Sequence, residues 1–255
     1  MPTAFAIGAH PDDIEFFMSG TLLLLEQAGY EIHYMNIANG CLGTAQHDRE
    51  TIIRIRREES INAATFAGAV HHEALCDDLG IYYEPELLAR LTSVIREVAP
   101  QIVLTHPPVD YMENHTNTCR LVVSAAFCRG MPNYPGDPSR EPFDGNVTIY
   151  HSQPAGNRDP LRNIVRPELF VDVTTVMAQR TQMLAKHVSQ KAWLDESQGM
   201  DSYLVAMQEM AREVGGMSGS YEFAEGWRRH LHFGFCGPED DPLHDALSDH
   251  VTGEG

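Results

Sequence analysis

Apolar positions along the first 130 residues follow two different periodicities. Short apolar runs cover residues 3–9 and 102–105, and residues 31–38 alternate apolar with polar side chains. These patterns predict strands. The intervening stretches carry apolar side chains at helical spacing and predict helices over residues 14–28, 49–67, 84–98 and 117–129. Alternating strands and helices favour a Rossmann-like three-layer α/β/α sandwich with a mainly parallel sheet.

The second half of the chain has a weaker pattern. Residues 130–166 are rich in Gly, Pro, Asn and Asp around one predicted strand at 147–151, and loops of this length usually border a functional cleft. A further strand and two helices are expected at residues 169–172, 174–187 and 202–214. We expect one domain over residues 1–236 and an acidic C-terminal tail over residues 237–255 that is mobile at its end.

Composition excludes several classes of partner. The 255 residues carry a formal net charge of −18, which would repel nucleic acid and anionic membrane surfaces. The apolar runs of the chain are too short to predict a membrane span. No cleavable apolar segment follows the first residues. The five cysteines are scattered without a CxxC pair, a pattern typical of reduced thiols in a cytoplasmic protein.

Candidate chemistry lies where two predicted strands end. His10, Asp12 and Asp13 follow the first strand, and the strand at 102–105 leads into a loop that ends with His115. The carboxyl ends of parallel strands meet at one edge of a sheet, so both loops should open on the same side. An imidazole and a carboxylate can bind a divalent metal, and a second carboxylate remains free to transfer a proton.

The natural ligand set is therefore His10, Asp13 and His115, with Asp12 as general base. Two imidazoles and one carboxylate leave positions open for water, as in catalytic zinc sites. In an alternative interpretation, one of the two aspartates caps the helix predicted to begin at residue 14. A capping role for one of them does not exclude catalysis.

Beyond this local pattern, the chain resembles a known family. The run from Ala6 to Glu15, followed by Ser-Gly-Thr at 19–21, is similar to the signature of the PIG-L/LmbE-like N-deacetylases. The resemblance extends over about residues 4–235. It continues through five further segments, at residues 39–44, 56–59, 110–115, 170–174 and 187–190.

The resemblance implies a function and a site. The family hydrolyses acetamido groups on sugars and sugar conjugates and usually binds zinc through two histidines and an aspartate, positions that His10, Asp13 and His115 match here, with Asp12 matching the base. An arginine associated with substrate contact matches either Arg56 or Arg57. His106, at the end of its strand, is a candidate for supporting a ligand or contacting substrate.

The chain departs from the family in its second motif. The family commonly has His-Pro-Asp-His where this chain has the sequence Met-Glu-Asn-His at residues 112–115. The first of the family's histidines is thought to stabilise the tetrahedral intermediate, and a methionine thioether cannot donate a hydrogen bond. Tyr111, His230 and His232 are the candidates to replace it.

The sequence thus predicts a zinc-dependent amidohydrolase that removes an N-acetyl group from an amino sugar or sugar conjugate. Two alternatives remain open: a hydrolase of another amide or ester, and a metal- or sugar-binding protein that has lost turnover. The His₂Asp set suits several divalent ions. The expected partner is a small N-acylated substrate. Self-association into a homo-oligomer is a further possibility that the sequence leaves open.

Overall fold

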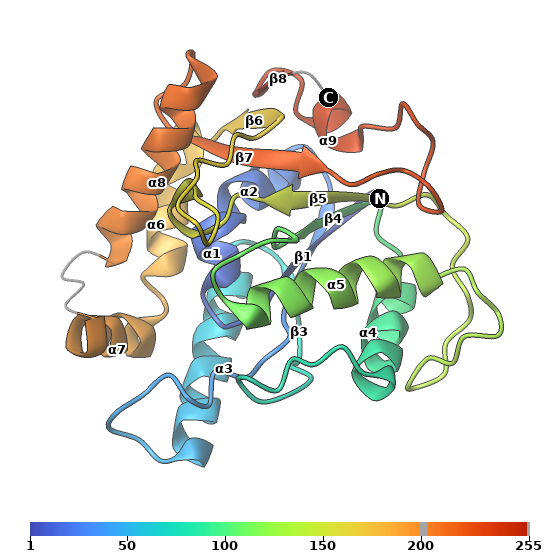
Figure 1. Ribbon diagram of the computed structural model, residues 1–255, viewed down its shortest axis with the longest axis horizontal. Coiled ribbons are helices and arrows are strands. Elements are labelled where there is room, and N and C mark those ends of the chain that lie inside the picture. Colours follow the sequence, from blue (N-terminus) through green and yellow to red (C-terminus); the bar gives the residue numbers. More distant parts are fainter. Residues whose placement is uncertain (199–202, 254–255) are drawn as a thin grey trace.

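The computed structural model describes residues 1–198 and 203–253. Within this part of the chain, one eight-stranded sheet with strand order β3-β2-β1-β4-β5-β7-β6-β8 lies between two layers of helices (Figure 1). The strands are β1 (Thr3–Gly8), β2 (Glu31–Asn36), β3 (Val70–His72), β4 (Ile102–Thr105), β5 (Thr148–Ser152), β6 (Leu169–Asp172), β7 (Ala224–Arg229) and β8 (Val251–Gly253). The helices are α1 (Asp13–Phe17), α2 (Ser19–Gln27), α3 (Arg49–Phe66), α4 (Pro85–Val98), α5 (Glu113–Cys128), α6 (Met177–Leu184), α7 (Val188–Gln198), α8 (Tyr203–Ser218) and α9 (Pro242–Ala246).

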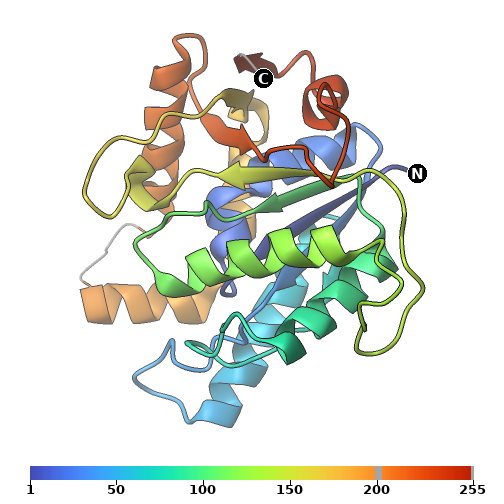
Figure 2. The same cartoon turned by 45° about the vertical axis from the view of Figure 1, so that its right-hand side comes forward.

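The sheet is parallel from β3 to β5 and antiparallel beyond it. β1 pairs with β2 and β4, and β5 pairs with β4, all in parallel. β7 then runs antiparallel to both β5 and β6, and β8 runs antiparallel to β6 (Figure 2). The three-layer α/β fold with a mainly parallel sheet is confirmed. The antiparallel edge is a finding of the structure, because the sequence pattern predicted neither β7 nor β8.

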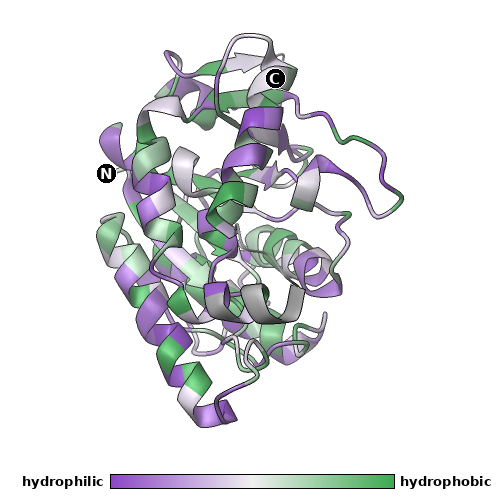
Figure 3. Ribbon diagram, turned by 90° about the vertical axis from the view of Figure 1, so that its left-hand side faces the viewer, coloured by the Kyte–Doolittle hydropathy of each residue, from purple (hydrophilic) through white to green (hydrophobic). Residues whose placement is uncertain are grey.

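Alternating residues of β1 supply two separate cores. Ala4 and Ala6 pack with side chains of α1, α2, α6 and α8, whereas Phe5 and Ile7 pack with those of α4 and α5. Successive strand residues point to opposite faces, so a strand buried on both faces reads as a continuous apolar run. The covering helices carry hydrophobic and hydrophilic positions together along their length (Figure 3), as expected for helices that bury one face.

Several helix ends follow from local chemistry. The Asp48 side chain accepts a hydrogen bond of 2.9 Å from the backbone N–H of Thr51 and caps α3. Gly68 follows that helix with a φ of 75°, a conformation that glycine adopts without steric cost. Pro85 opens α4, where its missing N–H has no helical partner to lose.

The helix predicted over residues 14–28 is in fact two helices. It breaks at Met18, whose φ is −137°. The N-terminus of α2 is held by a residue far away in sequence, because the Glu225 carboxylate of β7 accepts hydrogen bonds of 2.8 Å from the backbone N–H groups of Gly20 and Thr21. Arg180 lies 3.2 Å from the same carboxylate. No periodicity within residues 14–28 could reveal this tertiary cap.

Other boundaries also differ from the predicted ones. α5 begins at Glu113 instead of residue 117, which brings the second site segment onto its first turn. The segment from residue 237, expected as an acidic tail, contributes α9 and β8, and β8 pairs with β6; residues 254–255 lie outside the described part. None of the described helices has both the length and the apolar character needed to cross a bilayer.

Replacing Glu225 with alanine should destabilise the fold strongly. The change leaves the buried Arg180 without its carboxylate and removes the cap of α2, and breaking a buried pair on one side typically costs about 3–5 kcal/mol. Urea unfolding followed by circular dichroism measures the loss. Glu222→Ala, at an exposed position, serves as control and should stay within about 0.5 kcal/mol of wild type. Equal midpoints for the two variants would contradict this account.

Candidate metal centre

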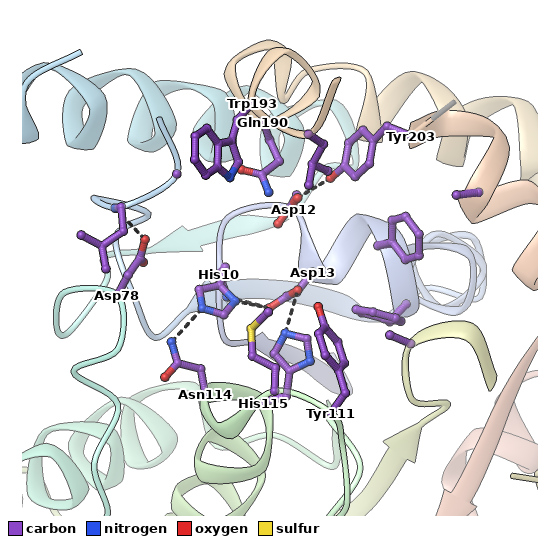
Figure 4. A pocket seen from close by; sticks show the side chains of 18 of the residues that line it. His10, Asp12, Asp13, Asp78, Tyr111, Asn114, His115, Gln190, Trp193 and Tyr203 are labelled. Carbon is purple, nitrogen blue, oxygen red and sulfur yellow. Dashed lines mark hydrogen bonds and ion pairs between the residues drawn. The ribbon is translucent and has the colours of Figure 1, made fainter. Parts of the chain in front are cut away.

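Two loops at one edge of the sheet form the candidate site. β1 ends at Gly8 and leads into the turn that carries His10, Asp12 and Asp13. β4 is its parallel neighbour and leads to the first turn of α5, which carries His115. Figure 4 shows His10, Asp13 and His115 facing one another. The predicted convergence of the two loops is present in the structure.

The predicted ligands have the spacing of a metal site. One donor atom from each of His10, Asp13 and His115 lies within 4.8 Å of the others. His115 Nε2 is 3.4 Å from Asp13 Oδ1, and His10 Nδ1 is 3.3 Å from Asp13 Oδ2. Asp13 and His115 are buried and His10 is half-buried. This donor set suits a divalent transition metal.

The two carboxylate oxygens of Asp13 have different contacts. Its Oδ2 accepts backbone hydrogen bonds from Ala9 at 3.1 Å and His10 at 2.7 Å, and His106 Nε2 lies 3.2 Å from the same atom. Oδ1 instead faces His115. Burial alone would raise the pKa of Asp13, but His115 and His106 hold it well below its usual range. The carboxylate therefore stays ionised, with one oxygen anchored and the other turned toward the ligand set.

His115 is oriented by Asp110, a residue that the sequence did not single out. His115 Nδ1 lies 3.1 Å from Asp110 Oδ1, and both side chains are buried. A carboxylate at this nitrogen fixes the tautomer and directs the other nitrogen toward a metal. Burial lowers the pKa of His115, but Asp13 and Asp110 together raise it to about 10; with no cation bound, these carboxylates thus favour a positive charge at this position. The available signal was an acidic residue in the same loop as the predicted ligand.

Asn114 orients His10 in a comparable way. Its Nδ2 lies 2.8 Å from His10 Nε2, and His10 Nδ1 is thereby left facing Asp13. The PIG-L/LmbE-like N-deacetylases commonly have an aspartate at the position that matches Asn114. A neutral amide can still hold the imidazole by a hydrogen bond, so this departure leaves the ligand orientation intact.

Asp12 points away from Asp13 toward a separate cluster. The Tyr203 hydroxyl donates a hydrogen bond to Asp12 Oδ2 (Figure 4). Arg56 Nη2 lies 3.7 Å from Asp12 Oδ1. Burial raises the pKa of Asp12 to about 6, against the opposing effect of Arg56. Its φ is 115° and its side chain makes no helix cap. Unusual backbone conformations of this kind cluster at functional sites, and the capping alternative does not hold for Asp12.

Of the two candidate arginines, the structure places Arg56 in the pocket. Arg56 is buried and donates a hydrogen bond of 2.6 Å from Nη2 to the carbonyl of Pro11. It packs against Gly40, where an added Cβ would lie 2.5 Å from the Arg56 side chain; the Asn-Gly turn thus makes room for the guanidinium. Arg57 is exposed and pairs with Glu73 at the surface.

These groups open into a pocket of about 520 Å³. Its wall includes apolar and aromatic side chains, namely Phe16, Phe17, Leu42, Leu79, Met112, Trp193, Leu194 and Met210. Gln190 and Trp193 extend toward it from α7 (Figure 4). A concave, largely apolar pocket with a few polar groups at one end is typical of small-molecule sites.

The remaining candidates from the sequence occupy different places. Tyr111 lines this pocket, whereas His106 is buried behind Asp13 and supports it from there. His230 borders a second pocket, with its Nδ1 2.9 Å from His151 Nε2, and the ring of His232 contacts that of Phe233 in a tilted arrangement. Tyr203 was missed because it lies 191 residues from its partner Asp12 and sits in an ordinary helical pattern.

Known proteins match both the motifs and the fold. The family model described as PIG-L, GlcNAc-PI de-N-acetylase, matches residues 5–126. The diacetylchitobiose deacetylase of Thermococcus kodakarensis is 26% identical over 87% of this chain and 80% of its own length. The 4-oxalmesaconate hydratase of Pseudomonas putida is 27% identical over 68% of each chain.

A solved structure agrees with this fold. The N,N'-diacetylchitobiose deacetylase from Pyrococcus horikoshii superposes with a TM-score of 0.77 and 22% identity, covering 91% of this chain and 84% of that one. The family match covers β1 to α5 and therefore both loops that carry the candidate ligands. On these grounds residues 5–126 match the PIG-L family, and the chain is similar to its deacetylases in sequence and in fold.

Proposed function

We propose that this protein is a metal-dependent amide hydrolase that removes an N-acetyl group from an amino sugar or sugar conjugate. His10, Asp13 and His115 would hold the metal, most simply zinc, and Asp12 would be the general base. One observation carries the proposal: a carboxylate outside the ligand set, Asp12, is held beside three converging donors at the end of a pocket. The similarity to a diacetylchitobiose deacetylase supports the substrate class.

The roles of the side chains follow from their contacts. A divalent cation bound here would supply Lewis acidity toward the acyl oxygen and lower the pKa of water. Asp12 takes the proton from the attacking water and returns it to the leaving amine. Tyr203 and Arg56 fix the Asp12 carboxylate for both transfers. Tyr111 lines the pocket next to His115, where its hydroxyl can donate to the developing oxyanion.

The wall of the pocket favours a substrate with few charges. Its described carboxylates are Asp12, Asp13 and Asp78, and its described Lys and Arg residues comprise Arg56 alone. A bound divalent cation would roughly neutralise this set, so nothing attracts a polyanion. The aromatic ring of Trp193 offers a surface for a sugar ring. The five cysteines are free, which supports the proposed cytoplasmic location.

A hydratase is the second candidate, favoured by the similarity to 4-oxalmesaconate hydratase. A cation and Asp12 could also direct water onto a carbon–carbon double bond. The name of that relative denotes a compound with several carboxylates, and the single arginine in the described wall of this pocket offers little to pair with them. Release of free amine from N-acetylated amino sugars, compared with the loss of ultraviolet absorbance of unsaturated carboxylates, distinguishes the two reactions.

Removing His115 should remove the metal. Wild-type protein should contain about one divalent ion per chain, and His115→Ala should contain little, because two ligands rarely retain a catalytic metal. Elemental analysis of the purified proteins measures this. His47→Ala, in an exposed loop, is the matched control and should keep its metal. A folded wild-type chain that takes up no metal after reloading would rule out the site.

Replacing Asp12 with asparagine should abolish turnover and leave the metal in place. Asparagine has the same shape and tolerates the positive φ of this position, but it cannot accept the proton. The expected loss in kcat is about 100-fold to 10,000-fold. Amine release and metal content are measured on the same samples, with the exposed Asp249→Asn as control. Full activity in Asp12→Asn would exclude the general-base role, and a wild type without turnover would favour a binding protein.

Tyr111 should carry the oxyanion role left open by Met112. Tyr111→Phe removes only the hydroxyl and should lower kcat about 100-fold, whereas His230→Ala and His232→Ala should stay near wild type because neither belongs to the described lining of the pocket. Steady-state kinetics on the same N-acetylated substrate compares the three. A large loss in His230→Ala with none in Tyr111→Phe would reverse the assignment.

A further inference from the structure

A second pocket, of about 630 Å³, lies between α5 and the end of β7. The segment joining β4 to α5 borders both pockets, because Pro108 lines the second and Tyr111 and Met112 line the first. The basic and imidazole side chains around the second pocket are Arg120, His151, Arg228, Arg229 and His230. Its described lining contains no Asp or Glu. In a chain with a net charge of −18, this concentration of positive groups is unusual.

The sheet brings part of this cluster together. His151 of β5 is the register partner of Arg228 of β7, and directly paired residues of antiparallel strands present their side chains on the same face. His230 follows on that face, and its backbone N–H donates a hydrogen bond of 2.9 Å to the carbonyl of Ile149. His151 Nε2 and His230 Nδ1 are 2.9 Å apart. Arg228 and His151 thus belong to the sheet, and His230 follows directly after β7 and is hydrogen-bonded to β5.

Arg228 lacks a counterion among the described residues. Its Nε is buried without a hydrogen-bond partner, and its Nη2 reaches the carbonyl of Ser152 at 3.3 Å. Burial lowers the pKa of Arg228, while Glu168 opposes that effect without forming an ion pair with it. Arg228 is half-buried. A guanidinium offers five N–H donors, and withdrawing part of its charge from water without a counterion costs free energy. An anion in the pocket would satisfy it.

A second guanidinium is available from α5. Arg120 is exposed and lies over the ring of Tyr83, 5.3 Å from its centroid, a contact that holds its charge at the pocket wall. Arg229, by contrast, is already used: its Nη1 lies 3.5 Å from Asp241 and donates to the carbonyl of Asp240. The charges that can meet a ligand are therefore those of Arg228 and Arg120.

We propose that this second pocket binds a small organic anion with a carboxylate or phosphate group. Arg228 and Arg120 hold the oxygens of the anion, since guanidinium groups match the planar fork of a carboxylate and the face of a phosphate. Pro108, Val123 and Leu231 line the same pocket and contact the apolar part of the ligand. The site is separate from the metal ligands and needs no metal of its own.

Calorimetric titration of the metal-loaded protein with phenyl phosphate and with benzoate tests this proposal. The two probes share an aromatic ring and differ in the anion, so the tighter one identifies phosphate or carboxylate as the preferred group. Arg228→Gln should weaken that binding at least about tenfold, the effect of losing a charge-assisted hydrogen bond. Arg54→Gln removes the same charge from an exposed helix position and should leave the affinity within about twofold. Because both variants keep the metal ligands, anion binding at the metal contributes equally to both.

Three outcomes would overturn the proposal. In the first, neither probe binds wild type. In the second, Arg228→Gln binds as tightly as Arg54→Gln. In the third, sedimentation shows an oligomer that Arg228→Gln dissociates, so that a second copy of the chain is the occupant. If Arg228→Gln does not fold, the exposed Arg120→Gln replaces it and should weaken binding several-fold.

Discussion

The site depends on the burial of one ionised carboxylate. Asp13 lies where β1 ends and α1 begins, and its charge is stabilised by two backbone N–H groups and by His106 and His115. Burying a carboxylate without such partners would neutralise it. Because these partners come from β4, α5 and the turn itself, the carboxylate fixes the two loops relative to each other. The parallel pairing of β1 with β4 is what makes this arrangement available.

A second polar cluster joins the site to the other helical layer. Asp12 contacts Arg56 of α3 and Tyr203 of α8, and the nearby Glu15 contacts His187. These contacts link the first turn to distant segments: Arg56 follows Pro11 by 45 residues, and Tyr203 follows Asp12 by 191. They also separate the two aspartates by environment, because Asp13 faces imidazoles while Asp12 faces a hydroxyl and a guanidinium. Two adjacent carboxylates can therefore do different chemistry.

The arginines of this acidic chain differ in how their positive charge is compensated. Arg180 is buried against Glu225, and Arg56 is buried beside Asp12, so each of these guanidinium groups is matched by a carboxylate. Arg96 and Arg129, also buried, instead donate several hydrogen bonds to backbone carbonyls. Arg228 has neither arrangement: its Nη2 reaches one carbonyl at 3.3 Å and its Nε has no hydrogen-bond partner among the residues that the structure describes. Arg228 is half-buried without a counterion in the described part of the chain, whereas a surface arginine such as Arg57 pairs with a carboxylate in solvent. This is the physical difference between the second basic pocket and the surface ion pairs.

The sequence by itself determined the parallel strands β1, β2, β4 and β5 and predicted which side chains meet at their edge. Continuous apolar runs mark strands buried on both faces, and the motif residues stand directly after β1, so the sequence pattern alone places His10, Asp12 and Asp13 at the edge of the sheet. Only the tertiary structure decided the rest. The run Ala-Glu-Gly-Trp-Arg-Arg of β7 has no strand periodicity, because Glu225 and Trp227 make buried polar contacts with α2. The choice of Arg56 over Arg57, the support of His115 by Asp110 and the pairing of Tyr203 with Asp12 rest on side-chain contacts formed only in the folded chain, which local sequence patterns do not encode.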